Sequence, residues 1–514
     1  MKKSQWMLVL VILLVGSLGA VGMGLVHRDS STIAAQKTEA LPSRFPPGLQ
    51  QIPRNPAFTQ YLQAKAAGKA VTRTPDGRGL GYVPPPIRLS RGVRPAVPQA
   101  QALALPATYD LRTLSKVSPV YNQGACGSCW SFASLESLES FLRPGYTGRL
   151  SENNLKDLHD FYNSCCDGGN ATMSTAYVAR WGTTALDFDG NTIYSGPVTN
   201  ACDPYSATSC SSPTTCALAR HVQTVYFLPL KQSLTDNYAI KTALMNYGAV
   251  YTAFQWEGSS SVKTPWWNLS TNSYYDKTRA GGNHAVTIIG WDDTFAKTSF
   301  STIPPGNGAW IVRNSWGTSW GDAGDFYVSY YDINMGHVEN AVFTAQWVGN
   351  YKKNYMYDYF GMGSSWGWGT DTVAYGANIF TSSAAGTLKA ISFWTPIAGT
   401  QFTAKIYVNP TAGKPASGTL KSTLSGSVYQ AGYYTKVLTT AVAVTNGQKF
   451  SVVIKFTTPG DGYPIPAQSW IPYFNDAVPL TPAGVSFISH DGITWYDLSG
   501  YDDYGVVNIH AFAN

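Results

Sequence analysis

Apolar and polar positions change their spacing partway through residues 105–348. In the first part, apolar side chains recur every three or four residues, which is typical of helices with one buried face. In the second part they alternate with polar ones or form short continuous runs, which is typical of strands. The predicted helices are Cys129–Leu142, a helix capped by Ser151 that runs through Leu155 and Leu158, and Thr235–Tyr247, which Gly248 ends. The predicted strands are Ala249–Phe254, Ala285–Trp291, Ala309–Arg313 and Phe326–Tyr330. Helices followed by strands indicate an α+β fold with two lobes.

Residues 349–514 show strand-like alternation throughout. The predicted strands are Lys389–Thr395, Phe402–Val408, Lys436–Ala443 and Phe450–Phe456, separated by turn dipeptides such as Asn446-Gly447. This part of the chain contains no Cys, Glu or Arg, whereas residues 105–348 hold all seven cysteines. The pattern predicts an all-β sandwich, and the change of composition predicts a domain boundary near Val348–Lys353.

The first 26 residues resemble a targeting segment. Lys2 and Lys3 precede an apolar stretch over residues 6–26, which is the pattern of an export signal. A stretch of about 20 apolar residues is also long enough to stay uncleaved as a membrane anchor. Either alternative predicts a protein that is secreted or held at the cell envelope.

Residues 27–104 contain many prolines and little sustained periodicity, apart from a short candidate helix near residues 55–69. They form either a flexible spacer or a propeptide. They also hold most of the positive charge. The chain has a formal net charge of +6, but residues 1–104 carry 13 basic and three acidic residues, and residues 105–514 are left with a net −4. The basicity is confined to the N-terminal fifth, so no nucleic-acid partner is predicted.

Residues 123–130 read Gln-Gly-Ala-Cys-Gly-Ser-Cys-Trp, and the last five match the sequence around the nucleophile of papain and the cathepsins. Two further motifs follow in the expected order: Asn-His-Ala-Val at residues 283–286 and Asn-Ser-Trp-Gly at residues 314–317. A thiol at a helix N-terminus is favoured as the thiolate by the helix dipole. A nearby imidazole can hold the charge and protonate a leaving amine. Residues 105–348 therefore resemble the papain-like cysteine peptidases.

This resemblance implies a role for each matching residue. Cys129 is the expected nucleophile, His284 its proton partner, and Asn314 the residue that orients the imidazole. The Gln123 amide, with the Cys129 backbone N–H, is expected to bind the oxyanion. Trp316 is expected to shield the hydrogen bond between His284 and Asn314 from water.

The cleft and one disulfide follow from the same resemblance. Residues 166–169 read Cys-Asp-Gly-Gly, so the backbone of Gly168 and Gly169 is expected to line the cleft and to pair with a bound peptide as an added strand. In the family the cysteine of this element pairs with the one three residues before the nucleophile, which implies a disulfide between Cys126 and Cys166. The cysteines Cys165, Cys202, Cys210 and Cys216 then allow three pairings, which stay open.

The spacing departs from the family pattern. His284 lies 155 residues after Cys129 and Asn314 lies 185 after it, where roughly 130–150 is usual. Insertions before His284, and between Asp292 and Asn307, account for the difference. They leave side-chain specificity open, because the base of the main side-chain pocket is not placed by any motif.

Two other parts of the chain also resemble known families. Residues 105–112, Leu-Pro-Ala-Thr-Tyr-Asp-Leu-Arg, resemble the mature N-terminus of the family, which favours a propeptide over residues 27–104 and suggests a short inhibitory segment. Residues 351–514 resemble the lectin-like β-domain that follows the peptidase in some bacterial and archaeal relatives. This implies a cell-surface glycan as a further partner.

We therefore expect an exported endopeptidase that hydrolyses protein or peptide substrates through a thioester intermediate. Two alternatives remain: a surface glycan-binding protein with an inactive peptidase scaffold, and a transpeptidase that uses an amine in place of water. No zinc-ligand spacing occurs, and the acidic pairs Asp292-Asp293 and Asp502-Asp503 fit solvated loops better than metal sites. No metal or cofactor is expected.

Overall fold

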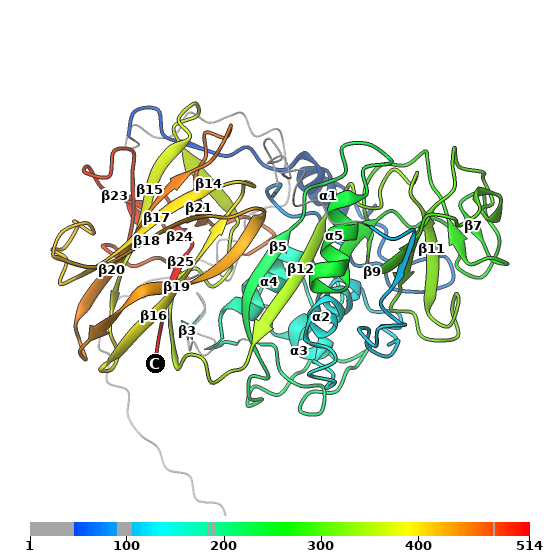
Figure 1. Cartoon of the computed structure of the whole chain (residues 1–514), viewed down its shortest axis with the longest axis horizontal. Coiled ribbons are helices and arrows are strands. Elements are labelled where there is room, and N and C mark those ends of the chain that lie inside the picture. Colours follow the sequence, from blue (N-terminus) through cyan, green and yellow to red (C-terminus); the bar gives the residue numbers. More distant parts are fainter. Residues whose placement is uncertain (1–45, 90–104, 182–184, 187–191, 195, 476–478) are drawn as a thin grey trace, which may run out of the picture. The chain divides into compact units, whose positions relative to one another are not determined.

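The computed structural model describes residues 46–89, 105–181, 185–186, 192–194, 196–475 and 479–514. Figure 1 traces the chain, with helices α2 to α5 in cyan to green and strands β14 to β25 in yellow-green to red. The predicted export signal or anchor at residues 6–26 lies outside the described residues. Within the described ranges, no helix is both long enough and apolar enough to span a bilayer.

The helical lobe is organised by α2. Helix α2 is buried on all sides, with residues 129–140 withdrawn from solvent and only its last turn partly exposed. A helix that is buried all round is central to a lobe, and here it packs against strands β6, β9 and β12. The helices of this lobe are α2 (Cys129–Leu142), α3 (Glu152–Asp157) and α4 (Ala171–Ala179), whereas α5 (Tyr238–Tyr247) packs against strands β6, β9 and β12 of the second lobe.

The second lobe is a largely antiparallel sheet built around β9, with one parallel pair, β11 with β8. Strand β9 (His284–Asp292) pairs with β6 on one side and with β10 on the other, and its first eight residues are buried. The other strands of this lobe are β2 (Thr108–Asp110), β5 (His221–Phe227), β6 (Val250–Phe254), β7 (Trp267–Asn268), β8 (Ser273–Tyr274), β10 (Ala309–Arg313), β11 (Asp325–Ser329) and β12 (Asn340–Gln346). Short elements of this part of the chain are the paired strands β3 (Ala185–Leu186) and β4 (Thr192–Ile193), and a 3₁₀ turn at Lys297–Ser299 between β9 and β10.

Residues 349–514 form a β-sandwich. One layer is the six-stranded sheet β18-β17-β20-β15-β22-β23, and strands β16, β19 and β25 face it across a core that includes Phe393, Phe402 and Phe456. Alternating burial along β17 explains why the sequence pattern found it. The strands are β13 (Lys353–Tyr355), β14 (Ser364–Gly367), β15 (Val373–Thr381), β16 (Gly386–Thr395), β17 (Gln401–Val408), β18 (Thr419–Ser427), β19 (Ala431–Val444), β20 (Lys449–Thr457), β21 (Ile465–Gln468), β22 (Ser486–Ser489), β23 (Tyr496–Asp497), β24 (Val506–Val507) and β25 (Ile509–Ala513), with a 3₁₀ turn at Leu498–Gly500.

One sheet crosses from the two-lobed part into the sandwich. Strand β5 pairs with β12 on one edge and with β19 on the other, where Ala431 to Tyr434 lie opposite Phe227 to Thr224. Among the described residues this sheet has 13 strands, and the described residues from 46 onward form one compact unit. Backbone hydrogen bonds of this sheet therefore join the two parts of the chain, although their compositions differ on either side of residue 348.

The predicted fold class is confirmed, and most predicted elements are present. Helix α2 has the predicted bounds, Ser151 caps α3 by accepting a hydrogen bond from the Asn154 backbone, and Gly248 ends α5 with a φ of 105°. The sequence analysis did not predict α4, β5 or β12. These elements are buried on nearly every side, so they lack the amphipathic alternation that identified the others.

The N-terminal segment, defined here as residues 46–89, contacts both parts of the chain. It begins with β1 (Gln50–Gln51), which pairs with β14 at the edge of the small sheet β1-β14-β21-β24. Helix α1 (Pro56–Ala66) follows, capped by the Asn55 side chain, and matches the predicted helix near residues 55–69. The segment then continues in extended form across the two-lobed part.

Candidate active site

Cys129 occupies the first position of α2, at the junction of the two lobes. The loop before it is held by a disulfide between Cys126 and Cys166. The Cys129 Sγ accepts a hydrogen bond of 3.3 Å from the backbone N–H of Ala285, in β9. This bond places Cys129, in the helical lobe, beside Ala285, which directly follows His284 in the second lobe.

His284 opens β9 and is fully buried. Its Nε2 lies 2.8 Å from the Asn314 Oδ1, and the ring stacks on Trp316 at a centroid distance of 4.7 Å. Its Nδ1 has no hydrogen-bond partner among the described residues. The contact with an amide oxygen places the proton on Nε2 and leaves Nδ1 as an acceptor.

The side chain of Gln123 takes part in three hydrogen bonds, accepting one and donating two. Its Oε1 accepts from the Ser315 hydroxyl at 2.5 Å, and its Nε2 donates to the Cys126 carbonyl at 2.7 Å. The same Nε2 donates to the Gly79 carbonyl of the N-terminal segment at 3.1 Å. The Gln123 amide is thus fixed beside the N-terminus of α2, and its N–H groups already donate to the carbonyls of Cys126 and Gly79.

The N-terminal segment passes directly through this site. The Gly169 N–H donates to the Gly81 carbonyl, and the Val83 N–H donates to the Gly169 carbonyl, both at 2.9 Å. On the other wall, the Tyr82 N–H donates to the Asn283 carbonyl at 3.0 Å. The segment is therefore paired as a strand with the backbone of both walls.

Glycine is required where the segment comes closest to the wall. A Cβ on Gly81 would lie 1.9 Å from the Gly127 carbonyl oxygen, and one on Gly79 would lie 2.1 Å from that of Cys126. Gly168 has a φ of 99°, and a Cβ there would lie 2.6 Å from the Gly81 carbonyl oxygen. Backbone packs on backbone at these points, which explains glycine on both partners.

The pKa values of the thiol and the imidazole both favour neutral groups in this state. Burial raises the pKa of Cys129 to about 12, although the backbone N–H groups of Ala285 and Gly81 partly oppose this. Burial also lowers the pKa of His284 to about 4, against the opposing effect of the hydrogen bond that its Nε2 donates to Asn314. The expected thiolate is therefore not favoured while the N-terminal segment covers it, because desolvation outweighs the donors at the helix N-terminus.

All seven cysteines are among the described residues, and Cys129 is the one without a disulfide. The pairing that the sequence left open is Cys165 with Cys210 and Cys202 with Cys216. The first of these lies beside the bond between Cys126 and Cys166, with the Cys165 and Cys166 sulfurs 3.6 Å apart. Two disulfides thus brace the loop that carries Gly168 and Gly169.

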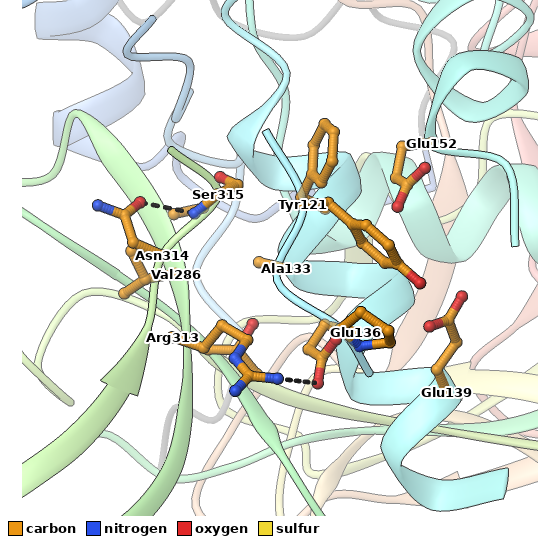
Figure 2. A pocket seen from close by; sticks show the side chains of 13 residues that line it. Tyr121, Ala133, Glu136, Glu139, Glu152, Val286, Arg313, Asn314 and Ser315 are labelled. Atoms are coloured by element: carbon orange, nitrogen blue, oxygen red, sulfur yellow. Dashed lines mark hydrogen bonds and ion pairs between the residues drawn. The ribbon is translucent and has the colours of Figure 1, made fainter. Parts of the chain in front are cut away.

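A group of buried carboxylates that the sequence analysis missed lies behind Asn314. Glu136 and Glu139 project from α2 and Glu152 from α3 into one small cavity (Figure 2). Arg313, next to Asn314, approaches the Glu136 carboxylate at 3.9 Å. Burial, with the neighbouring carboxylates, raises the pKa of Glu139 to about 8, and burial raises that of Glu152 to about 6. The available signal was a pair of glutamates three residues apart on a helix whose other side chains are apolar or serine.

Comparison with known proteins finds a match for each of the two parts of the chain. Residues 105–346 match the family model described as papain family cysteine protease, and residues 354–513 match that of a lectin-like domain. A cathepsin L-like peptidase of Aedes aegypti is 30% identical over 235 residues, 43% of this chain and 58% of that protein. Digestive cysteine proteinase 2 of Homarus americanus is 32% identical over 225 residues, 42% of this chain and 58% of that protein. The chain thus spans less than two thirds of the length of these relatives.

Two solved structures have a similar fold over most of this chain. The cysteine protease and lectin-like domains of Cwp84, a surface layer associated protein of Clostridium difficile, have a TM-score of 0.74 at 22% identity, covering 92% of this chain and 99% of that one. A Cwp84 variant after propeptide cleavage has a TM-score of 0.66 at 22% identity, covering 79% of this chain and 99% of that one. At this identity the likeness establishes the fold.

Proposed function

We propose that this chain, whose residues 105–346 are a papain-family cysteine protease domain and whose residues 354–513 are a lectin-like domain, is the latent precursor of an exported endopeptidase. The observation that carries the proposal is the meeting of Cys129, His284, Asn314 and Gln123 at the cleft where Gly169 already pairs with an extended chain. A peptide bound in place of that chain would lie beside the thiol.

In the proposed reaction, Cys129 attacks the peptide carbonyl carbon as a thiolate. His284 takes the thiol proton on Nδ1 and gives it to the leaving amine, while Asn314 holds the ring through Nε2. Gln123 Nε2 and the Cys129 N–H donate to the oxyanion, and Trp316 covers one face of the imidazole. Water then attacks the thioester carbonyl and releases the acid, returning the proton to the thiol.

The N-terminal segment is the proposed inhibitor. Its Gly79 carbonyl accepts the hydrogen bond that Gln123 would give to the oxyanion, and its Gly81 and Val83 use the backbone groups of Gly169. It also buries the Cys129 sulfur, which is fully withdrawn from solvent. A substrate cannot form the same contacts until this segment leaves.

The lectin-like domain helps to hold the inhibitor in place. Gln50 and Gln51 extend its β14, and the Ile52 N–H donates to the Ser365 carbonyl at 2.9 Å. The Phe58 ring packs edge-on against Phe474 at a centroid distance of 5.4 Å. Latency in this account depends on contacts far from the thiol.

Replacing Phe58 by alanine is expected to weaken latency without touching the cleft. Phe58 is 2% exposed, and losing a buried phenylalanine costs about 3–5 kcal/mol of packing. Local opening of the N-terminal segment should increase, so that Cys129 in the unprocessed chain is alkylated roughly tenfold faster or more. Gln60→Ala, on the exposed face of α1, is the matched control and should not alter the rate. An unchanged rate in Phe58→Ala would show that these contacts do not hold the segment.

We extend the proposal to location and partners. Three disulfides in the peptidase domain fit an oxidising compartment, in keeping with the apolar stretch at residues 6–26 as a signal or anchor. Cwp84 is described as surface layer associated. Secretion or attachment to the cell envelope, with a surface glycan bound by the lectin-like domain, is the matching proposal here. An array of surface glycans probed with the full-length Cys129→Ala chain tests the glycan partner, and no binding would contradict it.

One experiment separates the proposed activity from the two alternatives. The chain is cleaved at a protease site inserted within residues 90–104, the released segment is removed, and a denatured protein is added with and without an epoxysuccinyl inhibitor. Hydrolysis that the inhibitor blocks, with the label on Cys129, is expected. Peptide ligation with little hydrolysis would instead indicate a transpeptidase. Neither cleavage nor labelling would indicate a binding protein on an inactive peptidase scaffold.

A further inference from the structure

The side chain of Tyr205 binds both ends of the loop that precedes the nucleophile. Its phenol donates to the Gln123 backbone carbonyl at 2.9 Å and lies 2.7 Å from the Ser128 hydroxyl oxygen. Because the phenol proton is used for the carbonyl, the Ser128 hydroxyl is the donor in the second bond. Gln123 carries one proposed oxyanion donor, and Ser128 directly precedes Cys129, whose N–H is the other. Tyr205 therefore ties the residue that bears the first donor to the residue next to the second.

The Ser128 hydroxyl does not perform the task that serine usually has at this position. Ser128 is the N-cap residue of α2, but its side chain makes no capping hydrogen bond to the first turn. Burial dominates the pKa of the Cys129 thiol in the precursor, and the backbone N–H groups of Trp130 and of Cys129 itself are among the donors that oppose it. With the Ser128 hydroxyl bound to Tyr205, these N–H groups have no side-chain cap and can serve a thiolate and an oxyanion.

The loop that carries Tyr205, residues 202–216, is fixed by contacts of its own. The Tyr205 ring packs edge-on against Phe132 of α2 at a centroid distance of 4.7 Å. The fully buried Lys156 ammonium donates to the Ser209 carbonyl at 2.8 Å. Two disulfides have a cysteine in this loop, Cys165–Cys210 and Cys202–Cys216. None of these contacts involves residues 46–89, so they are expected to persist when the N-terminal segment leaves.

The Tyr205 phenol keeps its proton when the active site becomes charged. Burial, and after it the negative charges of Glu152, Asp157 and a Cys129 thiolate, raises the pKa of Tyr205 well above its ordinary value, although the hydrogen bond with Ser128 partly opposes this. The phenol therefore still donates to the Gln123 carbonyl after the thiolate has formed.

We propose that Tyr205 is a positioning residue of the peptidase, which fixes the spacing between the Gln123 side-chain amide and the Cys129 N–H that together receive the oxyanion. Tyr205 acts through these two donors. The inference rests on the proposed function and adds a residue to its mechanism. Its expected effect is large, because removing one oxyanion donor costs about 10²- to 10³-fold in kcat, and a displacement of about 1 Å can cost about 10²-fold.

Tyr205→Phe in the processed chain tests the inference, because phenylalanine keeps the ring against Phe132 and removes the hydroxyl. For a fluorogenic peptide, kcat is expected to fall roughly 10- to 100-fold while KM stays within about threefold, since the two donors act mainly on the transition state. Tyr357→Phe is the matched control. It removes a phenol that donates to the Ile379 carbonyl at 2.9 Å in the lectin-like domain, and kcat should not change.

A double-mutant cycle distinguishes positioning from a general loss of stability. In a Gln123→Ala background, the additional cost of Tyr205→Phe in kcat should be at least about threefold smaller, because one of the two positioned donors is already absent. The unfolding midpoint of each variant is measured in parallel. Should Tyr205→Phe fail to fold, Ser128→Ala removes the other hydrogen bond of the phenol and should also lower kcat, with KM within about threefold.

The outcomes separate this inference from the proposed function. An unchanged kcat in the folded variant would overturn the role of Tyr205 and leave the peptidase proposal standing. An effect confined to KM, or an equal cost in both backgrounds, would also overturn it. Failure of the unmodified processed chain to cleave the peptide would overturn the proposed activity and this inference together.

Discussion

Replacing Cys129 by serine in the processed chain is expected to lower kcat/KM for peptide hydrolysis by roughly 10⁴-fold or more, as removal of a nucleophile does in other triads. A serine hydroxyl in the same place does not ionise at neutral pH. His284, held by Asn314, would then have no thiol proton to accept, and no thiolate would form. The sulfur accepts a hydrogen bond from the Ala285 backbone, which a serine hydroxyl oxygen can also accept, so the exchange keeps this contact. Hydrolysis of a fluorogenic peptide measures the loss, and peptide binding by the variant measures what remains.

The comparison requires that the variant is folded. The unfolding midpoint of Cys129→Ser should stay within a few degrees of the unmodified chain, since the side chain is nearly isosteric. A folded variant that retains activity within tenfold would contradict the role of Cys129. The hydrolysis would then have to come from a different group.

Removing the N-terminal segment is expected to raise the alkylation rate of Cys129 by roughly 10³-fold at pH 7.5. With its pKa raised to about 12 by burial, the thiol of the full chain is almost entirely protonated at that pH. An exposed thiol with an ordinary pKa near 8.5 is about one tenth thiolate under the same conditions. Iodoacetamide reacts with the thiolate, so the rate reports its population.

The pH dependence gives a second readout of the same change. Because the pKa is raised, the thiolate appears only as pH climbs toward 12, and the rate for the full chain should rise throughout pH 6–10. The processed chain should level off at a lower pH. Alkylation in denaturant, equal for both forms, is the control. Equal rates and equal profiles in the folded state would show that the segment does not shield the thiol.

The sequence predicted those elements whose formation depends on neighbouring residues, such as helix periodicity, helix caps and alternate burial along a strand. Helix α2 was found from its apolar spacing, and α3 from the serine that caps it. Strand β17 was found from alternate burial. The motif residues Cys129 and His284 were predicted to meet by resemblance to a family, and the structure brings both to the junction between the lobes.

What the sequence did not predict depends on contacts between distant residues. No pattern in β5 shows that it pairs with β19, about 200 residues later in the chain. The N-terminal segment lacks periodicity because its residues 79–83 bond to other parts of the chain, one contact at a time. Glu339 lies between Val338 and Asn340, immediately before β12 begins, and only the fold shows that it is buried.

The protonation state of Cys129 could also not be predicted from the sequence motif alone. The position of Cys129 at the start of α2 was predicted, and it favours the charged form. The covering segment reverses the balance, because it removes water from both Cys129 and His284. Resemblance thus predicted which residues meet, whereas their protonation followed from what lies on top of them.

The most direct test of the account is the rate of peptide hydrolysis by one preparation before and after release of the N-terminal segment. The account predicts that the full chain is nearly inactive, that the processed chain is at least roughly 100-fold faster, and that an epoxysuccinyl inhibitor removes the gained activity. Equal activity in both forms would contradict inhibition by residues 46–89, and no activity in either form would contradict the peptidase itself.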